Sequence, residues 1–332
     1  MADIPPLAGR RRRERHEMGN EQQPAEYGHQ PVLLQEVLAY LVPQPGGLFI
    51  DGTVGAGGHT AALLDATAPD GRLLGFDRDP AALEFATRRL APYGGRFTPV
   101  AGSYAGMGDI APDHDFSTVD GILLDLGLSS RQLEDAKRGF SFLKEGPLDM
   151  RFNSHQGETA ADIVNNSSAE ELADIFRRYG EETQSRRIAR LIVVNRPLRT
   201  TTELAGLIER ELGRSRTGRH PATKVFQALR IAVNGELEEV ERGLHAAVGL
   251  LKPGGRLAVI SFHSLEDRLV KNFFRDLARD CVCPPEQPVC TCGATAVLKL
   301  VTRKAVKATD EEIAANLRSR SARLRVAVKL ED

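Results

Sequence analysis

A repeated pattern between residues 48 and 125 most narrows the folds that this chain can adopt. Short apolar runs alternate with helix-compatible segments: GLFIDGTVGAGGHT precedes AALLDAT, and GRLLGFDRDP precedes AALEFATRRLAPY. RFTPVAGSY and VDGILLDLGLSS supply a third and a fourth apolar run. Strands that alternate with helices assemble as right-handed βαβ units, so the pattern predicts an α/β protein with a mainly parallel, doubly wound sheet.

The alternation stops after residue 135. Helical patches such as ELADIFRRYG and SRRIARLIVVN follow, without a convincing strand. A further helical stretch, VFQALRIAVNGELEEVERGLHAAVGLL, leads into KPGGRLAVISFHS, where a buried strand resumes after two glycines. We therefore predict a discontinuous sheet domain, residues 29–135 and 226–332, and an inserted helical domain, residues 136–225, between its fourth and fifth strands.

The charge of the chain is unevenly distributed. Lys+Arg is 44 and Asp+Glu is 45, and the net charge of −1 excludes a uniformly basic nucleic-acid coat. Residues 177–230, however, contain 13 Lys/Arg and 5 Glu, a balance of +8 that leaves −9 for the remainder. A basic insertion on an acidic body is typical of an enzyme that binds a polyanion, although arginine-rich helix faces are more often only solvated.

The N-terminal residues 1–28 are polar and include RRRRER at 10–15. This composition predicts a disordered basic arm; a start site assigned too early and an arm that touches RNA are the alternatives. The arginine run is not followed by an apolar segment, so it is not a signal peptide.

No apolar run in the chain approaches the roughly 18–20 residues of a membrane helix, and we expect a cytoplasmic protein with reduced thiols.

A glycine-dense loop, DGTVGAGGH, runs from Asp51 to His59 after the first predicted strand. Its backbone can approach a ligand closely, and the N–H groups of the following helix suit an anionic group. The spacing is neither G-x-G-x-x-G nor G-x-x-x-x-G-K-[ST], which disfavours a dinucleotide and a nucleoside triphosphate. Asp77, at the end of the next strand and 20 residues after Gly57, suits the two hydroxyls of a ribose. Together they favour S-adenosylmethionine, although glycine-rich turns also occur without a ligand.

Three other polar segments lie where predicted strands end, which is where open α/β sheets bind ligands. Tyr104 follows the third strand, where its ring would either stack on an adenine or fill the core. Asp125 ends the fourth strand, and because an unpaired buried carboxylate is costly, a role in a site is favoured over packing. Gln132 lies in the loop beyond it. SFHSLED, at residues 261–267, is either the rim of a site or a helix start that Ser264 caps.

All four cysteines form one pattern, C-x-C-x6-C-x-C, in Cys281, Cys283, Cys290 and Cys292. Four thiolates would suit a structural zinc ion, although zinc-binding pairs are usually spaced C-x2–4-C. Reduced thiols without a metal and a redox-labile pair are the alternatives.

Several long segments resemble one known family. They are HQPVLLQEVL, DGTVGAGGHT, GFDRDP, DGILLDLGLSS, RGFSF, GPLDMR, YGEE, HPATKVFQALRIAVNGELEE, GGRLAVISFHSLEDR and RSRSARLRV. From about His29 to near the C-terminus, the chain resembles the bacterial ribosomal RNA small-subunit methyltransferase H family. The resemblance implies a class I, Rossmann-like, S-adenosylmethionine-dependent methyltransferase sheet with an inserted helical domain. It also implies methyl transfer from S-adenosylmethionine to the N4 amine of one decoding-centre cytidine in small-subunit (16S) rRNA.

The same resemblance implies particular site residues. Cofactor contacts would come from Gly57, Gly58, His59, Asp77, Tyr104, Asp125 and Gln132. Phosphates of the RNA would bind to the inserted substrate-recognition domain through Arg186, Arg187, Arg190, Arg216, Arg219 and Lys224. A late basic run either extends that surface or forms the charged edge of a closing strand, in Arg318, Arg320, Arg323 and Arg325. The chain departs from the commonest family pattern in residues 1–28, and the cysteine segment occurs in only part of the family.

Methylation of a cytosine N4 amine makes specific chemical demands. The lone pair is delocalised into the ring, so the enzyme must align the amine with the sulfonium methyl group and accept hydrogen bonds from N4–H. The base must also leave any stack. Many amino-methyltransferases carry D/N-P-P-Y after the fourth strand, but this chain has Asp125-Leu126-Gly127-Leu128 there. Asp125 is therefore only a positional candidate for the catalytic acceptor.

The expected partner is 16S rRNA within the 30S subunit, with no membrane, and the sequence is compatible with a monomer or a dimer. One alternative is a methyltransferase of the same fold that acts on another nucleic acid or on protein. Another is a non-enzymatic 30S assembly factor. Transfer of a labelled methyl group to 30S subunits separates these possibilities.

Overall fold

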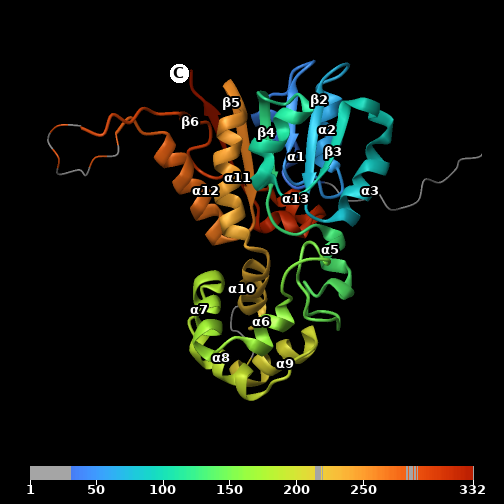
Figure 1. The fold of residues 1–332 in the computed structure, drawn as a ribbon, viewed down its shortest axis with the longest axis vertical. Coiled ribbons are helices and arrows are strands. Elements are labelled where there is room, and N and C mark those ends of the chain that lie inside the picture. Colours follow the sequence, from blue (N-terminus) through green and yellow to red (C-terminus); the bar gives the residue numbers. More distant parts are fainter. Residues whose placement is uncertain are drawn as a thin grey trace, which may run out of the picture.

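The structure is a computed structural model that describes residues 31–213, 218, 220–281, 283, 287, 289 and 291–331, without the side chains of Ser130 and Arg131. Figure 1 shows the described residues as two lobes, an upper one built on a β-sheet and a lower one made of helices. The basic arm expected at residues 1–28 and the start of order expected near His29 lie outside the described residues.

A seven-stranded sheet organises the upper lobe. Its strands are β1 (Leu48–Asp51), β2 (Arg72–Asp77), β3 (Phe97–Ala101), β4 (Val119–Asp125), β5 (Leu251–Ser261), β6 (Leu298–Leu300) and β7 (Arg323–Lys329). They lie in the order β3-β2-β1-β4-β5-β7-β6, in which β1 to β5 are parallel and β7 is antiparallel to both of its neighbours. The predicted α/β class is confirmed. Because the strand order reverses between β1 and β4, the sheet has the switch point at which open α/β sheets bind ligands.

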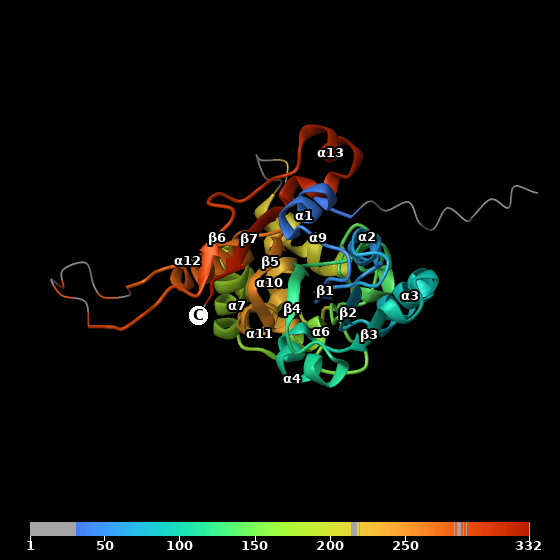
Figure 2. The ribbon, with the colours of Figure 1, turned by 90° about the horizontal axis from the view of Figure 1, so that it is seen from above.

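Helices cover both faces of this sheet. They are α1 (Leu34–Leu41), α2 (Gly58–Ala66), α3 (Pro80–Leu90), α4 (Met107–Ile110), α11 (Glu236–Leu250), α12 (Ser264–Leu277) and α13 (Asp310–Ala315). The short helix α5 (Ser130–Glu134) follows β4, and its Leu133 packs against the core of the lower lobe instead. Figure 2 shows α4 and α11 on one side of the strands and α1 and α13 on the other. Leu123 and Leu124 are fully buried in two different cores, because successive side chains of a strand point to opposite faces.

The lower lobe is a helical insertion between β4 and β5, as predicted. Its helices are α6 (Ala160–Asn166), α7 (Ala169–Gly180), α8 (Ser185–Val194), α9 (Thr201–Leu212) and α10 (Thr223–Asn234). Capping boxes that begin at Thr159, Ser168 and Thr200 start α6, α7 and α9, since each hydroxyl accepts a backbone N–H that the helix itself leaves unpaired. Phe176 and Leu229 are fully buried in the insertion's own core.

The long helical stretch expected after residue 225 is divided into two helices. Gly235, with φ +60°, ends α10 and precedes α11; this left-handed conformation favours glycine. Phe226 and Leu229 of α10 pack in the core of the insertion, whereas Leu244 of α11 packs against the sheet. The packing therefore changes lobes at Gly235, nine residues after the boundary expected from sequence. The apolar periodicity continues through both helices, which is why the sequence does not reveal the break.

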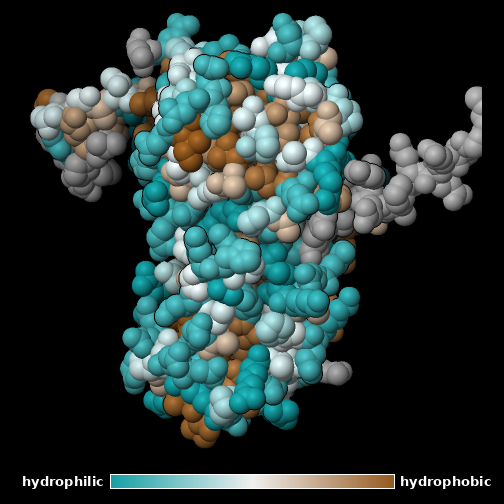
Figure 3. Space-filling model, turned by 45° about the vertical axis from the view of Figure 1, so that its right-hand side comes forward, coloured by the Kyte–Doolittle hydropathy of each residue, from teal (hydrophilic) through white to brown (hydrophobic). Residues whose placement is uncertain are grey.

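No helix among the described residues is long and apolar enough to cross a membrane. Figure 3 shows a largely hydrophilic surface on the insertion, with a group of hydrophobic side chains at its lower tip. Val194, the last residue of α8, is one of the exposed apolar residues of this lobe, with 82% of its surface accessible.

Candidate active site

A cavity lies at the carboxyl ends of β1, β2 and β4, where the sheet meets the insertion. Its walls include the glycine-dense loop after β1, Asp77 at the end of β2, Asp125 at the end of β4, and the first turn of α11. Among the residues implied as cofactor contacts, those that line this cavity are Gly58, His59, Asp77, Tyr104, Asp125 and Gln132. The structure therefore brings together residues that are 74 positions apart in the chain, from Gly58 to Gln132.

Asp51 holds the start of the glycine-dense loop. One oxygen of its buried carboxylate accepts the Thr53 N–H at 3.0 Å, and the other accepts the Thr60 hydroxyl at 2.7 Å. Gly52 has no room for a side chain, because a Cβ there would lie 2.4 Å from Leu124. The loop therefore lies flat against β4, and its backbone forms part of the cavity wall.

Gly57 differs from the other implied contacts. It precedes α2 with φ +76°, and a Cβ at this position would lie 3.2 Å from Leu90 of α3, behind the cavity wall. Its function in the structure is to let the loop turn into α2. Gly58 and the backbone of Gly55 face the cavity instead.

Asp77 lies opposite the loop at the end of β2. Its carboxylate accepts two backbone N–H groups, from Gly55 at 2.8 Å and from Asp79 at 2.8 Å. Burial nevertheless raises the pKa of Asp77 to about 6. A carboxylate that lines a cavity and is this poorly solvated is well suited to accept further hydrogen bonds from ligand hydroxyls.

Tyr104 begins the short 3-10 helix Tyr104–Gly106 beyond β3, and Ser103 caps this turn by accepting the Ala105 N–H at 3.0 Å. Its ring packs closely against α11, because a Cβ on Gly243 would lie 2.3 Å from a ring carbon of Tyr104. Burial, with smaller effects from the carboxylates of Glu266 and Glu239, raises the pKa of Tyr104 well above its usual value. The ring is thus neutral, with an edge facing the helix and a surface in the cavity.

His59 and Asp125 face each other across the cavity wall. The Nε2 of His59 lies 2.9 Å from the carbonyl oxygen of Val32, which can only accept, so Nε2 carries the proton and donates it. Burial lowers the pKa of His59, which keeps the imidazole neutral and leaves Nδ1 as an acceptor. Nδ1 lies 3.7 Å from one carboxyl oxygen of Asp125.

Asp125 is the most unusual polar side chain of the site. Its Oδ1 is buried and has no hydrogen-bond partner among the described residues. Burial, together with the charges of Asp51 and Glu266, raises the pKa of Asp125 well above its usual value. An unsatisfied buried carboxyl oxygen is unfavourable in the ligand-free protein, so it indicates a position where a ligand supplies the donor.

Gln132 on α5 is fixed by hydrogen bonds within the protein. Its Oε1 accepts the Ser129 N–H at 3.0 Å, and its Nε2 donates to Asp79 at 3.1 Å. Asp79 also accepts from Arg138 at 2.6 Å and caps α3 through the Ala81 N–H. Gln132 therefore ties the loop after β4 to the start of α3 and presents only part of its amide to the cavity.

Five carboxyl groups line the cavity, and the sequence reasoning singled out two of them, Asp77 and Asp125. The others are Glu236 and Glu239 of α11 and Glu266 of α12. Arg230 pairs with Glu236 through two contacts of 2.8 Å, and burial still raises the pKa of Glu236. These glutamates are parts of the NGELEE and SFHSLEDR segments, whose polar density was the available signal. The cavity consequently favours a cationic group.

The start of α12 differs from the expectation. His263, not Ser264, is the N-cap: its ring accepts the Glu266 N–H, and Glu266 accepts the His263 N–H in return. Ser264 is the first helical residue and donates instead to Glu181 of the insertion at 2.6 Å. This hydrogen bond joins the two lobes beside the cavity.

Asn234, the last residue of α10, joins the lobes at the other side. Its side chain accepts the Phe152 N–H at 2.8 Å and donates to the Met150 carbonyl at 2.8 Å. Its own carbonyl accepts from Arg78 at 3.0 Å, the residue next to Asp77. Arg78 and Phe152 both line the cavity. Asn234 therefore links the end of β2 with the two segments that join the insertion to the sheet lobe, one near Phe152 and the other at Asn234 itself.

The basic residues of the insertion lie on its outer surface. Arg186, Arg187 and Arg190 are exposed on α8 and line a shallow groove with Arg177. Arg187 is paired with Glu211 at 2.8 Å, and Lys224 donates to the Glu181 carbonyl at 2.8 Å, so these two are partly engaged. Two further candidates, Arg216 and Arg219, lie outside the described residues.

The late arginines separate into two groups. Arg318 lines the cavity, and Arg320 is exposed. Arg323 and Arg325 of β7 both pair with Asp267, at 3.0 and 2.7 Å, and Arg325 is buried. These two belong to the closing strand, as the alternative interpretation proposed, and do not extend a free basic surface.

With this geometry established, comparison with known proteins gives the family. The model of the MraW methylase family matches residues 26–330. The chain belongs to the MraW methylase family. It is 53% identical over 92% of its length to the ribosomal RNA small subunit methyltransferase H of Geobacter sulfurreducens, of which it covers 99%. It is 54% identical over 91% of its length to the protein of the same name from Thermomicrobium roseum, of which it covers 94%.

Among solved structures, a SAM-dependent O-methyltransferase of Thermotoga maritima is similar over 92% of this chain and 68% of that one, with 12% identity and a TM-score of 0.40. Membership of a methylase family confirms the predicted methyltransferase activity and the expected methyl donor, S-adenosylmethionine. The family resemblance seen in the sequence is confirmed as well.

Proposed function

We propose that this enzyme transfers a methyl group from S-adenosylmethionine to the N4 amine of a decoding-centre cytidine in 16S rRNA of the 30S subunit. Full-length relatives named as ribosomal RNA small subunit methyltransferases support the RNA substrate. An amine is favoured as the methylated group because Oδ1 of Asp125 has no partner among the described residues. It offers an N–H donor a buried hydrogen-bond acceptor in the lining of the cavity. We also place this activity in the cytoplasm, where 30S subunits are found.

The cavity residues fit S-adenosylmethionine. Asp77 would accept the ribose hydroxyls, the ring of Tyr104 would pack against the adenine, and the loop at the start of α2 would receive the methionine carboxylate. When bound, the cofactor supplies an electrophilic methyl group on a sulfonium ion. The surrounding carboxylates stabilise that positive charge, and Asp125, Glu236, Glu239 and Glu266 all line the cavity.

Asp125 would act on the nucleophile. Accepting a hydrogen bond from N4–H orients the amine and stabilises the positive charge that develops on it as the lone pair leaves the ring. His59 lies on the other side of Asp125, with Nδ1 3.7 Å from a carboxyl oxygen, and its own ring is fixed by the hydrogen bond from Nε2 to the Val32 carbonyl. His59 is therefore a positioning residue, and Asp125 is the group in contact with substrate.

The insertion would bind the RNA. We take it to extend from about residue 136 to Asn234, because α10 packs in its core. Arg186 and Arg190 on α8 would contact phosphates, since Arg187 and Lys224 already have partners within the protein. The target base would leave its stack and enter the space between the insertion and the sheet lobe.

The decisive experiment uses 30S subunits from cells that lack this gene. Purified protein and S-adenosylmethionine are added, and methylated nucleotides are located by mass spectrometry of rRNA digests. We expect one N4-methylated cytidine at the decoding centre, and none with Asp125→Ala. Methylation of naked RNA, DNA or protein alone would refute the ribosomal substrate, and an inert protein that binds both ligands would indicate an assembly factor.

A further inference from the structure

Residues 278–297 join α12 to β6, and those of them that the structure describes project from the body of the protein. Figure 1 shows these described residues extending beyond the end of α12, away from the insertion. The described residues of this segment form no helix or strand, and Val289 has 68% of its surface exposed. Hydrogen bonds join its two ends: Ala296 N–H donates to Asp280 at 3.1 Å, and Val297 N–H to the Leu277 carbonyl at 2.8 Å. Irregular segments of this length are uncommon in compact domains unless they have a function.

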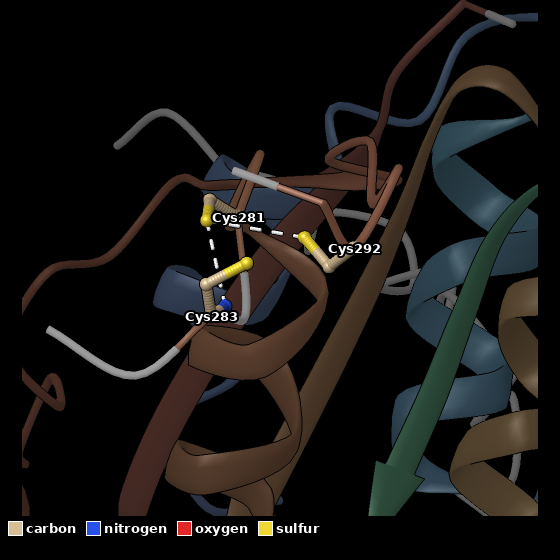
Figure 4. A group of neighbouring side chains, drawn as sticks. All are labelled: Cys281, Cys283 and Cys292. Carbon is tan, nitrogen blue, oxygen red and sulfur yellow. Dashed lines mark hydrogen bonds between the residues drawn. The ribbon is translucent and has the colours of Figure 1, made fainter. Parts of the chain in front are cut away.

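Three cysteine side chains converge in this segment. The Sγ atoms of Cys281, Cys283 and Cys292 all lie within 4.8 Å of one another, and Figure 4 shows them directed toward a common space. The Sγ atoms of Cys281 and Cys292 are 3.9 Å apart. Four thiolates bound to one zinc ion at about 2.3 Å are about 3.8 Å from each other, whereas a disulfide bond is about 2.05 Å long. The separation thus fits two ligands of one ion.

The local backbone also favours metal binding. The Cys283 N–H donates to the Cys281 sulfur at 3.4 Å, a contact that stabilises negative charge on a thiolate. The sulfurs of Cys281 and Cys283 face the same space. Gly293, with φ +58°, makes a turn directly after Cys292. The short C-x-C spacing is therefore no obstacle to chelation in this structure.

We propose that residues 278–297 bind one zinc ion through the thiolates of Cys281, Cys283 and Cys292. Zinc is the choice because clustered thiolates are its preferred ligands in structural sites, and the 3.9 Å between the Cys281 and Cys292 sulfurs fits a tetrahedral ion. Binding releases the three thiol protons to solvent and forms three zinc–sulfur bonds, with no change of oxidation state. None of the described residues of this segment is buried, so the ion would supply the fixed contacts that a hydrophobic core supplies elsewhere.

The ion has no part in methyl transfer. Helix α12 begins beside the cavity, at Ser264, and ends at Leu277, where the cysteine segment starts. A helix of 14 residues is about 21 Å long, which separates the sulfur cluster from the cofactor cavity. The site is therefore structural, and it would fix the projecting segment as a surface for contact with other molecules.

The test measures metal in the full-length protein, purified with a phosphine reductant and without chelator. We expect one zinc per chain by inductively coupled plasma mass spectrometry, released stoichiometrically by a mercurial reagent. Cys281→Ser with Cys292→Ser should reduce the zinc content at least tenfold, whereas Thr291→Ala, an exposed neighbour in the same segment, should keep it. Binding of S-adenosylhomocysteine by the double variant shows that the enzyme remains folded.

Two further measurements sharpen the result. Proteinase K should cleave the segment at least tenfold faster in the double variant than in the zinc-bound protein. Cys290, which lies outside the described residues, is tested as the fourth ligand: Cys290→Ser should weaken zinc binding further than Thr291→Ala does. Protein that contains no zinc and does not take it up from added zinc chloride, that contains iron instead, or that has a disulfide among these cysteines would overturn the proposal.

Discussion

Asp77 should make cofactor binding depend on pH. In the free enzyme its pKa is about 6, mainly because the carboxylate is buried, and only two backbone N–H groups, from Gly55 and Asp79, oppose that effect. Ribose hydroxyls can donate to both oxygens only when the group is ionised. Binding should therefore shift the pKa of Asp77 downward and release a proton near pH 6.

The magnitude follows from the shift. Raising the pKa from 3.8 to about 6 corresponds to a net cost of about 3 kcal/mol for ionising Asp77 in the folded protein. The pKa of Asp77 is higher in the folded than in the unfolded protein. Asp77 therefore contributes fully to the free energy of unfolding of the cofactor-free protein below pH 3.8, and this contribution is lost as the pH rises through 6. At pH 5 about one tenth of the Asp77 carboxyl groups are ionised. Because the ionised form binds the ligand, the affinity for S-adenosylhomocysteine should be about tenfold lower at pH 5 than at pH 7.5.

Titration calorimetry between pH 5 and 8, in buffers of different ionisation enthalpy, measures both affinity and proton release. Asp77→Asn should weaken binding about 10- to 100-fold at pH 7.5, since it removes charge-assisted hydrogen bonds of about 1.5–3 kcal/mol. It should also abolish the pH dependence. Asp109→Asn, at an exposed position of α4, is the matched control and should behave as the wild type.

Either of two results would refute this reasoning. One is an Asp77→Asn variant that binds with wild-type affinity at pH 7.5. The other is a variant that binds weakly but retains proton release near pH 6, which would assign the titration to another group of the cavity, such as His59.

Three more predictions address the chemistry, the RNA surface and the insertion core. Asp125→Asn should lower single-turnover methylation about 10²–10³-fold while changing S-adenosylhomocysteine affinity much less; equal losses would contradict the acceptor role. Arg186→Ala with Arg190→Ala should reduce the salt slope of RNA binding by about 1.4–1.8, measured by filter binding, and Arg88→Ala on α3 should leave it unchanged. Phe176→Ala, fully buried in the insertion, should destabilise that lobe by about 3–5 kcal/mol in denaturant unfolding, yet preserve cofactor binding; loss of both would show that the lobes do not fold independently.

The parts of the fold and site that the sequence predicted depend on local pattern. Apolar runs that end in glycine or aspartate place Asp77 and Asp125 at strand ends, and parallel strands bring such ends to one edge. The glycine loop, its turn into α2 and the insertion after β4 follow from the same periodicity. These features need only a few neighbouring residues to be recognised.

The remainder depends on contacts between distant residues. Arg187 pairs with Glu211 and Arg325 with Asp267, so two arginines that composition alone assigns to a basic surface already have partners within the protein. Glu236 reaches the cavity only because the chain breaks at Gly235 and sends α11 back to the sheet. Helical periodicity does not reveal such a break, and charge counts do not reveal pairing across 58 residues.

The hydrogen bonds of Asn234 have a consequence for binding order. They connect Arg78, the neighbour of Asp77, with Met150 and Phe152, where the chain enters the insertion. A cofactor that fixes Arg78 thereby also fixes the angle between the lobes, and RNA held across both lobes fixes Arg78 in return. Thermodynamic reciprocity then requires that the two ligands strengthen each other's binding by the same factor, and the enzyme would retain its methyl donor most tightly when the ribosomal substrate is in place.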